Sequence, residues 1–168
     1  MAAHAHRHHD ARSVKCGVVT VSDSRTEEND TSGQLIQHLL REAGHEIELY
    51  RIVKDEPDRI ADVLRSAPET TQAIICNGGT GLARRDSTYE AISALLEKEI
   101  TGFGELFRML SYEQIGAAAI LSRATAGVAG GRIIFTLPGS SAAVELAMTK
   151  LILPELGHMV GLVRNSEG

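Results

Sequence analysis

The residues best suited to chemistry in this chain form a glycine-rich loop with a carboxylate behind it. The loop is Asn77-Gly78-Gly79-Thr80-Gly81, and Asp86 follows it after two arginines. Glycine has no Cβ, so several backbone N–H groups of such a loop can approach an anion closely, and the helix expected to begin near Ser87 adds a favourable dipole. The segment has neither the GxxxxGK[ST] nor the GxGxxG spacing, which excludes a Walker loop and a dinucleotide fingerprint. We therefore predict a site for a phosphate-bearing ligand, with an ordinary tight turn as the alternative.

A second carboxylate, Asp55, lies directly before Glu56 and Pro57. An aspartate at this position, or at Asp86, can cap the helix that follows or can bind a metal carried by a ligand. For either residue taken alone, both interpretations stay open. If the two carboxylates face one cleft, the ligand or metal role is favoured.

Three further polar segments could line such a cleft. Ser22-Asp23-Ser24-Arg25 offers hydroxyls, a carboxylate and a guanidinium, which suit a phosphate or a polar heterocycle, or simply form a solvated turn. In Gly102-Phe103-Gly104-Glu105 the acid can accept hydrogen bonds from a ligand, or the segment only seats the next helix. Ser122-Arg123 can contact an anion or pair with an acidic neighbour.

An α/β scaffold would bring these segments together. Mostly apolar strands are expected at residues 14–21, 73–76 and 132–137, and a strand with alternating apolar and polar residues is expected at 46–53. Helices are expected between and after them, with starts at Thr31 and Ser87 in capping boxes with Gln34 and Glu90, at Pro57, at Gly102 and after Pro138. This alternation predicts a three-layer, doubly wound, mostly parallel sheet. The carboxyl ends of its strands, where open parallel sheets bind ligands, would carry four polar segments, at residues 22–25, 54–56, 77–81 and 138–141.

Length and charge limit the classes of protein to consider. With 168 residues the chain has the size of one domain, and its net charge of -5 and pI near 5.8 lack the general attraction to nucleic acid of a basic domain. We expect residues 1–13, which include His4, His6, His8 and His9, to be a flexible tail, and residues 14–168 to be the domain. Metal binding by these histidines is the alternative.

The cysteines and the apolar runs indicate a compartment. Cys16 and Cys76 lie in apolar runs, as expected of buried thiols in a reducing environment, which predicts a cytoplasmic protein. No stretch approaches the roughly 18 consecutive apolar residues of a membrane span. We therefore expect no membrane association.

The segments SDSR, KDE, NGGTG with RRD, GFGELFR, SRATAG and LPGSS resemble, in this order, the molybdenum cofactor biosynthesis MogA/MoaB family. The resemblance covers about residues 14–160, and GFGELFRMLSYEQIG with SRATAGVAG is similar to the MoaB branch. It implies a molybdopterin-binding fold that assembles as a trimer or hexamer. It also implies transfer of an adenylyl group from Mg-ATP to the terminal phosphate of molybdopterin, whose product would pass to a molybdenum-insertion protein.

The resemblance implies roles for individual residues. Asp55 and Asp86 match the catalytic acids of the family and would hold Mg²⁺ or orient the phosphates. The other matching positions, which would bind the substrates, are Ser22, Asp23, Ser24, Arg25, Asn77, Gly78, Gly79, Thr80, Gly81, Thr88, Gly104, Glu105, Ser122, Arg123, Pro138, Gly139 and Ser140. A non-catalytic molybdopterin-binding or carrier protein is the alternative, and a nucleotide-binding regulatory subunit is a third hypothesis.

Overall fold

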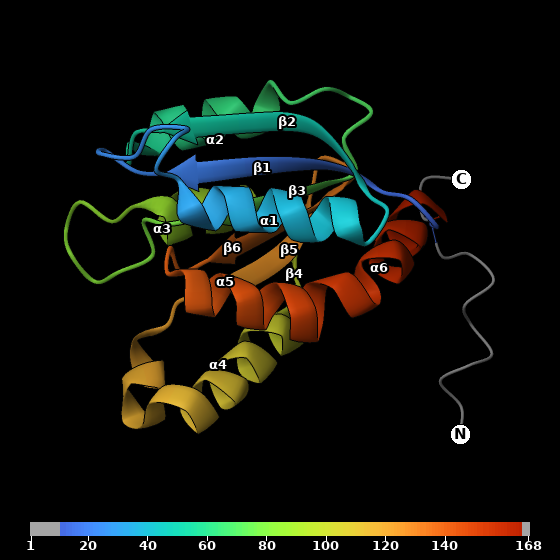
Figure 1. The fold of residues 1–168 in the computed structure, drawn as a ribbon. Coiled ribbons are helices and arrows are strands. Elements are labelled where there is room, and N and C mark those ends of the chain that lie inside the picture. The colour runs from blue at the N-terminus through green and yellow to red at the C-terminus, as the bar shows by residue number, and fades with distance from the viewer. Residues whose placement is uncertain (1–10, 166–168) are drawn as a thin grey trace.

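A six-stranded sheet between two layers of helices forms the part of the chain, residues 11–165, that the computed structural model describes (Figure 1). The parallel part consists, in spatial order, of β2 (Glu46–Val53), β1 (Lys15–Val21), β3 (Ala73–Asn77) and β6 (Arg132–Leu137). Next to β6 lie β5 (Thr125–Ala129) and β4 (Lys98–Glu99), both in antiparallel pairs. The predicted three-layer, mostly parallel α/β fold is confirmed, with all four expected strands in place.

The two antiparallel strands were not predicted, and their composition explains why. β4 has only two residues, and β5 is built mainly from small ones. A Cβ on Gly127 of β5 would lie 2.4 Å from the carbonyl oxygen of Lys98, so only glycine lets the two strands meet there. Such short and glycine-containing strands lack the β-branched pattern by which strands are found in a sequence.

Helices cover both faces of the sheet. One face is covered by α1 (Thr31–Glu42), α4 (Thr101–Ile115), α5 (Ser141–Ala147) and α6 (Leu153–Asn165), and the other by α2 (Pro57–Arg65) and α3 (Thr88–Ser93). A 3₁₀ turn, η2 (Gly116–Leu121), follows α4, and a π-helical turn, η3 (Met148–Ile152), joins α5 to α6. Successive strand residues point to opposite faces, so Ile75 joins the core beneath α1 while Ile74 joins the core beneath α2.

The start of α1 differs from the prediction by one residue. Asp30, rather than Thr31, is the N-cap, because its carboxylate accepts the N–H of Gly33 at 3.0 Å. The same buried carboxylate accepts hydrogen bonds of 2.6 Å from the hydroxyls of Thr20 and Tyr50. Burial and the bond to Asp30 raise the pKa of Tyr50. This network fixes the start of α1 against β1 and β2.

The first and last described segments pack on each other. Ala11 donates its N–H to the carbonyl of Gly157 in α6 at 3.1 Å, so the ordered domain extends beyond the predicted boundary at residue 14. The four tail histidines lie outside the described residues. One helical run in the described part, spanning Ser141–Asn165, is long and apolar enough to cross a membrane by length and composition alone, a criterion that buried core helices also meet. Its buried residues, among them Val144, Ile152 and Val160, belong to the domain core.

Both cysteines are buried and free, as predicted. Cys16 lies in β1 and Cys76 in β3, on opposite faces of the sheet. Burial raises the pKa of each thiol to about 12. The thiolate form, which reacts, is therefore disfavoured at neutral pH.

The stability of this fold should depend on the protonation of His45. Its Nδ1 accepts the N–H of Val14 at 3.1 Å, and burial lowers the pKa of His45 below the usual 6.5. As the pH falls below about 6.5, the unfolded chain binds a proton that the folded imidazole excludes, so the free energy of unfolding should decrease. His45→Asn, which keeps an acceptor and does not titrate, should lose less stability than the wild type between about pH 6.5 and 5 in urea unfolding.

The matched control is His38→Asn, because the side chain of His38 is 71% exposed. This control should follow the pH dependence of the wild type. Identical slopes for His45→Asn and the wild type would contradict the assignment.

Candidate functional site

The parallel register gathers four polar segments at one edge of the sheet. Val21 pairs with Val53, and Asn77 pairs with both Thr20 and Leu137, so the loops that leave these strands are neighbours. Backbone bonds continue the ladder into the loops, from Ser22 N–H to Val53 at 2.9 Å and from Gly78 N–H to Leu137 at 3.0 Å. The predicted clustering at the carboxyl edge is confirmed.

A cavity of about 440 Å³ opens at this edge. Its polar side is formed by the glycine loop, Asp86 and the Pro138-Gly139-Ser140 turn, and its apolar side by α4 and η2. On α4 the lining residues Phe107, Ser111 and Ile115 recur every four positions, which places them on one face of the helix. The sequence analysis missed these three residues, although that spacing was the available signal.

A smaller cavity of about 180 Å³ lies on the other side of the loop. It shares Gly78 and Gly139 with the larger one and adds Ser22, Arg25 and Asp30 to the lining. The two glycines touch, since a Cβ on Gly139 would lie 3.2 Å from the Cα of Gly78. The two cavities therefore form adjoining parts of one site.

The glycine loop presents unpaired backbone donors. Gly78 and Gly79 have φ of +91° and +67°, values that L side chains rarely adopt. Within residues 11–165, the N–H groups of Gly79, Thr80, Gly81 and Leu82 have no hydrogen-bond acceptor. Four consecutive donors of this kind suit an anion.

One carboxylate oxygen of Asp55 accepts two hydrogen bonds, and the other faces the glycine loop. Oδ1 accepts the N–H of Ser87 at 2.9 Å and its hydroxyl at 2.7 Å, whereas Oδ2 would be 2.6 Å from a Cβ on Gly79. The predicted capping box of Ser87 with Glu90 is thus wrong, because the Ser87 side chain binds Asp55 instead. The N–H that binds Asp55 belongs to Ser87, the N-cap residue of the short α3, whereas the first N–H of the helix, from Thr88, donates to the carbonyl of Gly79 at 3.0 Å.

Asp86 lies at the other end of the loop. Its Oδ2 accepts the N–H of Ala83 at 3.2 Å and would be 2.6 Å from a Cβ on Gly81. The described residues contain no group of three or more His, Cys, Asp or Glu side chains that could hold a metal. Mg²⁺ is commonly bound by one or two carboxylates together with substrate phosphates, so Asp55 and Asp86 fit an ion that arrives with its ligand.

Two hydroxyl groups at the site have no partner. Thr88 Oγ1 and Ser122 Oγ are buried without a hydrogen bond to any described residue. Thr88 lies against Gly79, where a Cβ would be 2.1 Å from its hydroxyl, and Ser122 lines the larger cavity. Buried polar groups are normally satisfied, so these two are available to a ligand or to water.

The turn at residues 22–25 is organised by its own hydrogen bonds. Ser22 Oγ accepts the N–H groups of Ser24 and Arg25 at 3.2 and 3.1 Å. Asp23 accepts the N–H of Asp55 at 3.1 Å and forms an ion pair with Arg85. The turn therefore ties the loops after β1, β2 and β3 together, and Ser22 and Arg25 also line the smaller cavity.

Seven predicted site residues are not among the residues that line the two cavities: Asp23, Ser24, Asp55, Thr88, Gly104, Glu105 and Arg123. Glu105 is exposed on α4, and neither it nor Gly104 is among the lining residues. Gly104 packs closely against the residue before β5, since a Cβ on Gly104 would be 2.9 Å from the carbonyl oxygen of Ala124. Arg123 also lies outside the lining and pairs with Glu90, which is the acidic-neighbour alternative.

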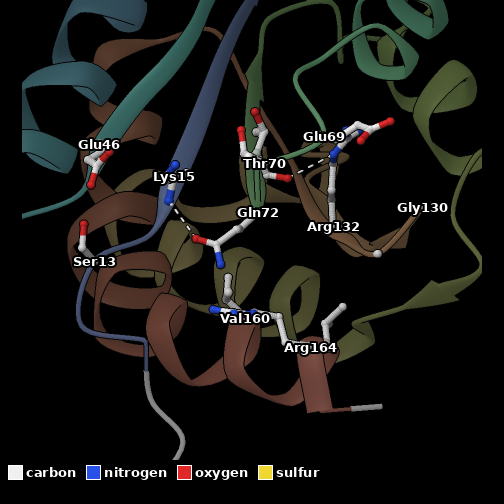
Figure 2. A pocket seen from close by; sticks show the side chains of 13 residues that line it. Ser13, Lys15, Glu46, Glu69, Thr70, Gln72, Gly130, Arg132, Val160 and Arg164 are labelled. Carbon is white, nitrogen blue, oxygen red and sulfur yellow. Dashed lines mark hydrogen bonds between the residues drawn. The ribbon is translucent and has the colours of Figure 1, made fainter. Parts of the chain in front are cut away.

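A larger cavity of about 530 Å³ lies at the opposite, amino-terminal edge of the parallel strands (Figure 2). Two of its cationic side chains already have partners. Lys15 donates its backbone N–H to Gln72 Oε1 at 3.0 Å, and the ammonium of Lys15 pairs with Glu48 at 3.3 Å. Arg132 donates to the carbonyls of Leu64, Ala67, Pro68 and Thr71. We therefore place the candidate site at the carboxyl edge, where consecutive donors are free.

Comparison with known proteins identifies the family of this chain. Residues 17–158 match the family described as "Probable molybdopterin binding domain". Molybdenum cofactor biosynthesis protein B of Bacillus subtilis is 54% identical over 170 aligned residues, covering 99% of this chain and 100% of that protein. Its counterpart from Bacillus cereus is 53% identical, with coverages of 95% and 96%. The crystal structure of the tungsten cofactor synthesizing protein MoaB from Pyrococcus furiosus superposes with a TM-score of 0.83 at 40% identity, covering 92% of this chain and 99% of that one.

Gly79 should tolerate no side chain. Gly79→Ala adds a Cβ at 2.1 Å from Thr88 Oγ1 and forces alanine into a positive φ, whereas Gly44→Ala, at φ +87° with no atom within 4 Å, has only the φ penalty. In urea unfolding we expect Gly44→Ala to lose about 1–2 kcal/mol and Gly79→Ala about 1–3 kcal/mol more. Equal losses would contradict the close packing at Gly79.

Proposed function

Because this chain belongs to the molybdopterin-binding family of molybdenum cofactor biosynthesis, we propose that it transfers an adenylyl group from ATP to molybdopterin. An oxygen of the terminal phosphate of molybdopterin attacks the α-phosphorus of ATP and forms a new P–O bond. The bond from the α-phosphorus to the bridging oxygen breaks, and its electron pair leaves with pyrophosphate. The products are adenylylated molybdopterin and pyrophosphate.

One observation carries this proposal: four free backbone N–H groups with an aspartate at each end. Two anionic reactants repel each other, so a catalyst must hold them in line and neutralise the developing charge. The N–H groups of residues 79–82 supply fixed partial positive charges for the phosphates. Thr88 and Ser122 supply two unpaired hydroxyls beside the same loop.

Asp55 and Asp86 are the residues that would hold Mg²⁺. The ion, when bound, would neutralise phosphate charge as a Lewis acid. Ser87 fixes Asp55 through two bonds to Oδ1, which leaves Oδ2 facing the loop. The apolar wall of Phe107 and Ile115 offers a surface for the heterocyclic part of a substrate, with Ser111 as a polar contact. A reducing cytoplasm suits both the dithiolene of molybdopterin and the free cysteines.

The reaction can be tested with purified components. Molybdopterin, Mg²⁺ and ATP should give adenylylated pterin and pyrophosphate, and Asp55→Asn or Asp86→Asn should slow turnover at least about a hundredfold while the protein stays folded. Asp62→Asn is the matched control, because this α2 aspartate has a 77% exposed side chain and pairs with Arg65 on the surface of the same helix. Absence of product where a catalytic relative is active would rule out adenylyl transfer.

The second candidate is a non-catalytic molybdopterin-binding or carrier protein. It is favoured by the structural bonds of both aspartates, since Asp55 accepts the N–H of Ser87 and Asp86 accepts the N–H of Ala83. This candidate predicts pterin binding with no consumption of ATP. The same assay therefore separates the two functions.

We also propose that the chain assembles as a trimer or hexamer through an exposed apolar face on α4 and η2. This face consists of Leu106, Met109, Tyr112, Ile115, Ile120 and Leu121. Exposed apolar residues gathered on neighbouring elements mark an interaction surface, and Ile115 and Leu121 also line the 440 Å³ cavity at the carboxyl edge. A neighbouring copy would thus cover part of the site.

Met109→Glu should reduce the molar mass in light scattering to that of a monomer, because a buried unpaired charge opposes association. Leu162→Glu, at a similarly exposed apolar residue on α6, is the control and should keep the wild-type mass. An assembly unaffected by Met109→Glu would place the interface elsewhere.

A further inference from the structure

Arg123 binds the backbone of the glycine loop. Its Nε–H donates to the carbonyl of Thr80 at 2.8 Å, and Nη2 donates to the carbonyl of Gly81. Nη1 forms an ion pair with Glu90, and the guanidinium lies 5.1 Å from the centre of the Tyr89 ring. The side chain is 21% exposed, so its charge is directed largely at protein groups.

The two held carbonyls determine where the neighbouring N–H groups point. In a trans peptide the N–H is opposite to the C=O, and the described residues contain no cis peptide bond. The carbonyl of Thr80 shares its peptide group with the N–H of Gly81, and the carbonyl of Gly81 shares its own with the N–H of Leu82. Both N–H groups therefore point away from Arg123. They have no acceptor in the described chain. Thr80 and Gly81 line the cavity, whereas Leu82, the next residue, and Arg123 are not among its lining residues.

We propose that Arg123 is a positioning residue, which orients the N–H groups of Gly81 and Leu82 toward the phosphates of the ligand without itself binding the anion. A peptide group next to glycine turns over readily, because glycine populates both signs of φ. The planar fork of a guanidinium can hold two carbonyls and a carboxylate at once. This inference rests on the proposed phosphate chemistry of the same site.

Arg123→Lys separates positioning from direct charge attraction. Lysine keeps the positive charge, but a single ammonium group cannot reproduce the fork. In calorimetric titration with pyrophosphate and Mg²⁺, we expect affinity to fall at least about tenfold, the effect of losing hydrogen bonds to a charged group. Affinity equal to that of the wild type would overturn the positioning role.

Amide NMR provides a second measurement. Its result would not change if Arg123 served only to stabilise the fold. Pyrophosphate should shift the amide signals of Gly81 and Leu82 in the wild type, and this response should be reduced in Arg123→Lys. If these two amides do not respond in the wild type, the proposal is wrong, and this measurement requires no variant to fold.

Glu90→Gln is the matched control, because it removes the ionic partner of Arg123 and leaves both carbonyls available. It should change pyrophosphate affinity less than about threefold, because the Glu90 side chain is 58% exposed and solvent screens its charge. A loss as large as that in Arg123→Lys would assign the effect to the ion pair and overturn the proposal. If the wild type binds pyrophosphate through these amides but forms no adenylylated pterin, the proposed reaction fails and the role of Arg123 stands.

Discussion

The site depends on the passage of the backbone at Gly79 between two side chains. Asp55 Oδ2 and Thr88 Oγ1 occupy the space that a Cβ would need, and the positive φ turns the chain at this point. Because no side chain fits, main-chain atoms form this wall of the site. The consecutive N–H groups that follow remain unpaired, and the function proposed for the protein relies on them.

The groups that surround this loop hold one another in place. Asp23 accepts the N–H of Asp55 and pairs with Arg85, while Ser87 donates twice to Asp55. Arg123, which precedes β5, donates to the loop carbonyls of Thr80 and Gly81. Fixed donors of this kind stabilise charge without reorganising during a reaction. Several polar residues that look like ligand contacts in the sequence thus serve first to build the loop.

Periodicity made much of the fold predictable. The parallel strands β1, β3 and β6 carry apolar runs and β2 alternates apolar and polar residues, and their order places the polar segments at one edge. The strands β4 and β5 were not predictable, because close approach at Gly127 rather than β-propensity brings them together. The cap of α1 was misplaced by one residue, since Asp30 is selected by Thr20 and Tyr50, which lie on two different strands.

The sequence by itself determined the α/β class, the edge that carries the site, the glycine loop and the two aspartates beside it. These features follow from local patterns, in which neighbouring residues decide strand, helix or turn. Only the tertiary structure decided that Ser87 orients Asp55, that Arg123 faces the loop carbonyls, and that Glu105 lies away from the cavities. Each of these depends on the distance between side chains far apart in the chain, which packing and register set and local propensity does not encode.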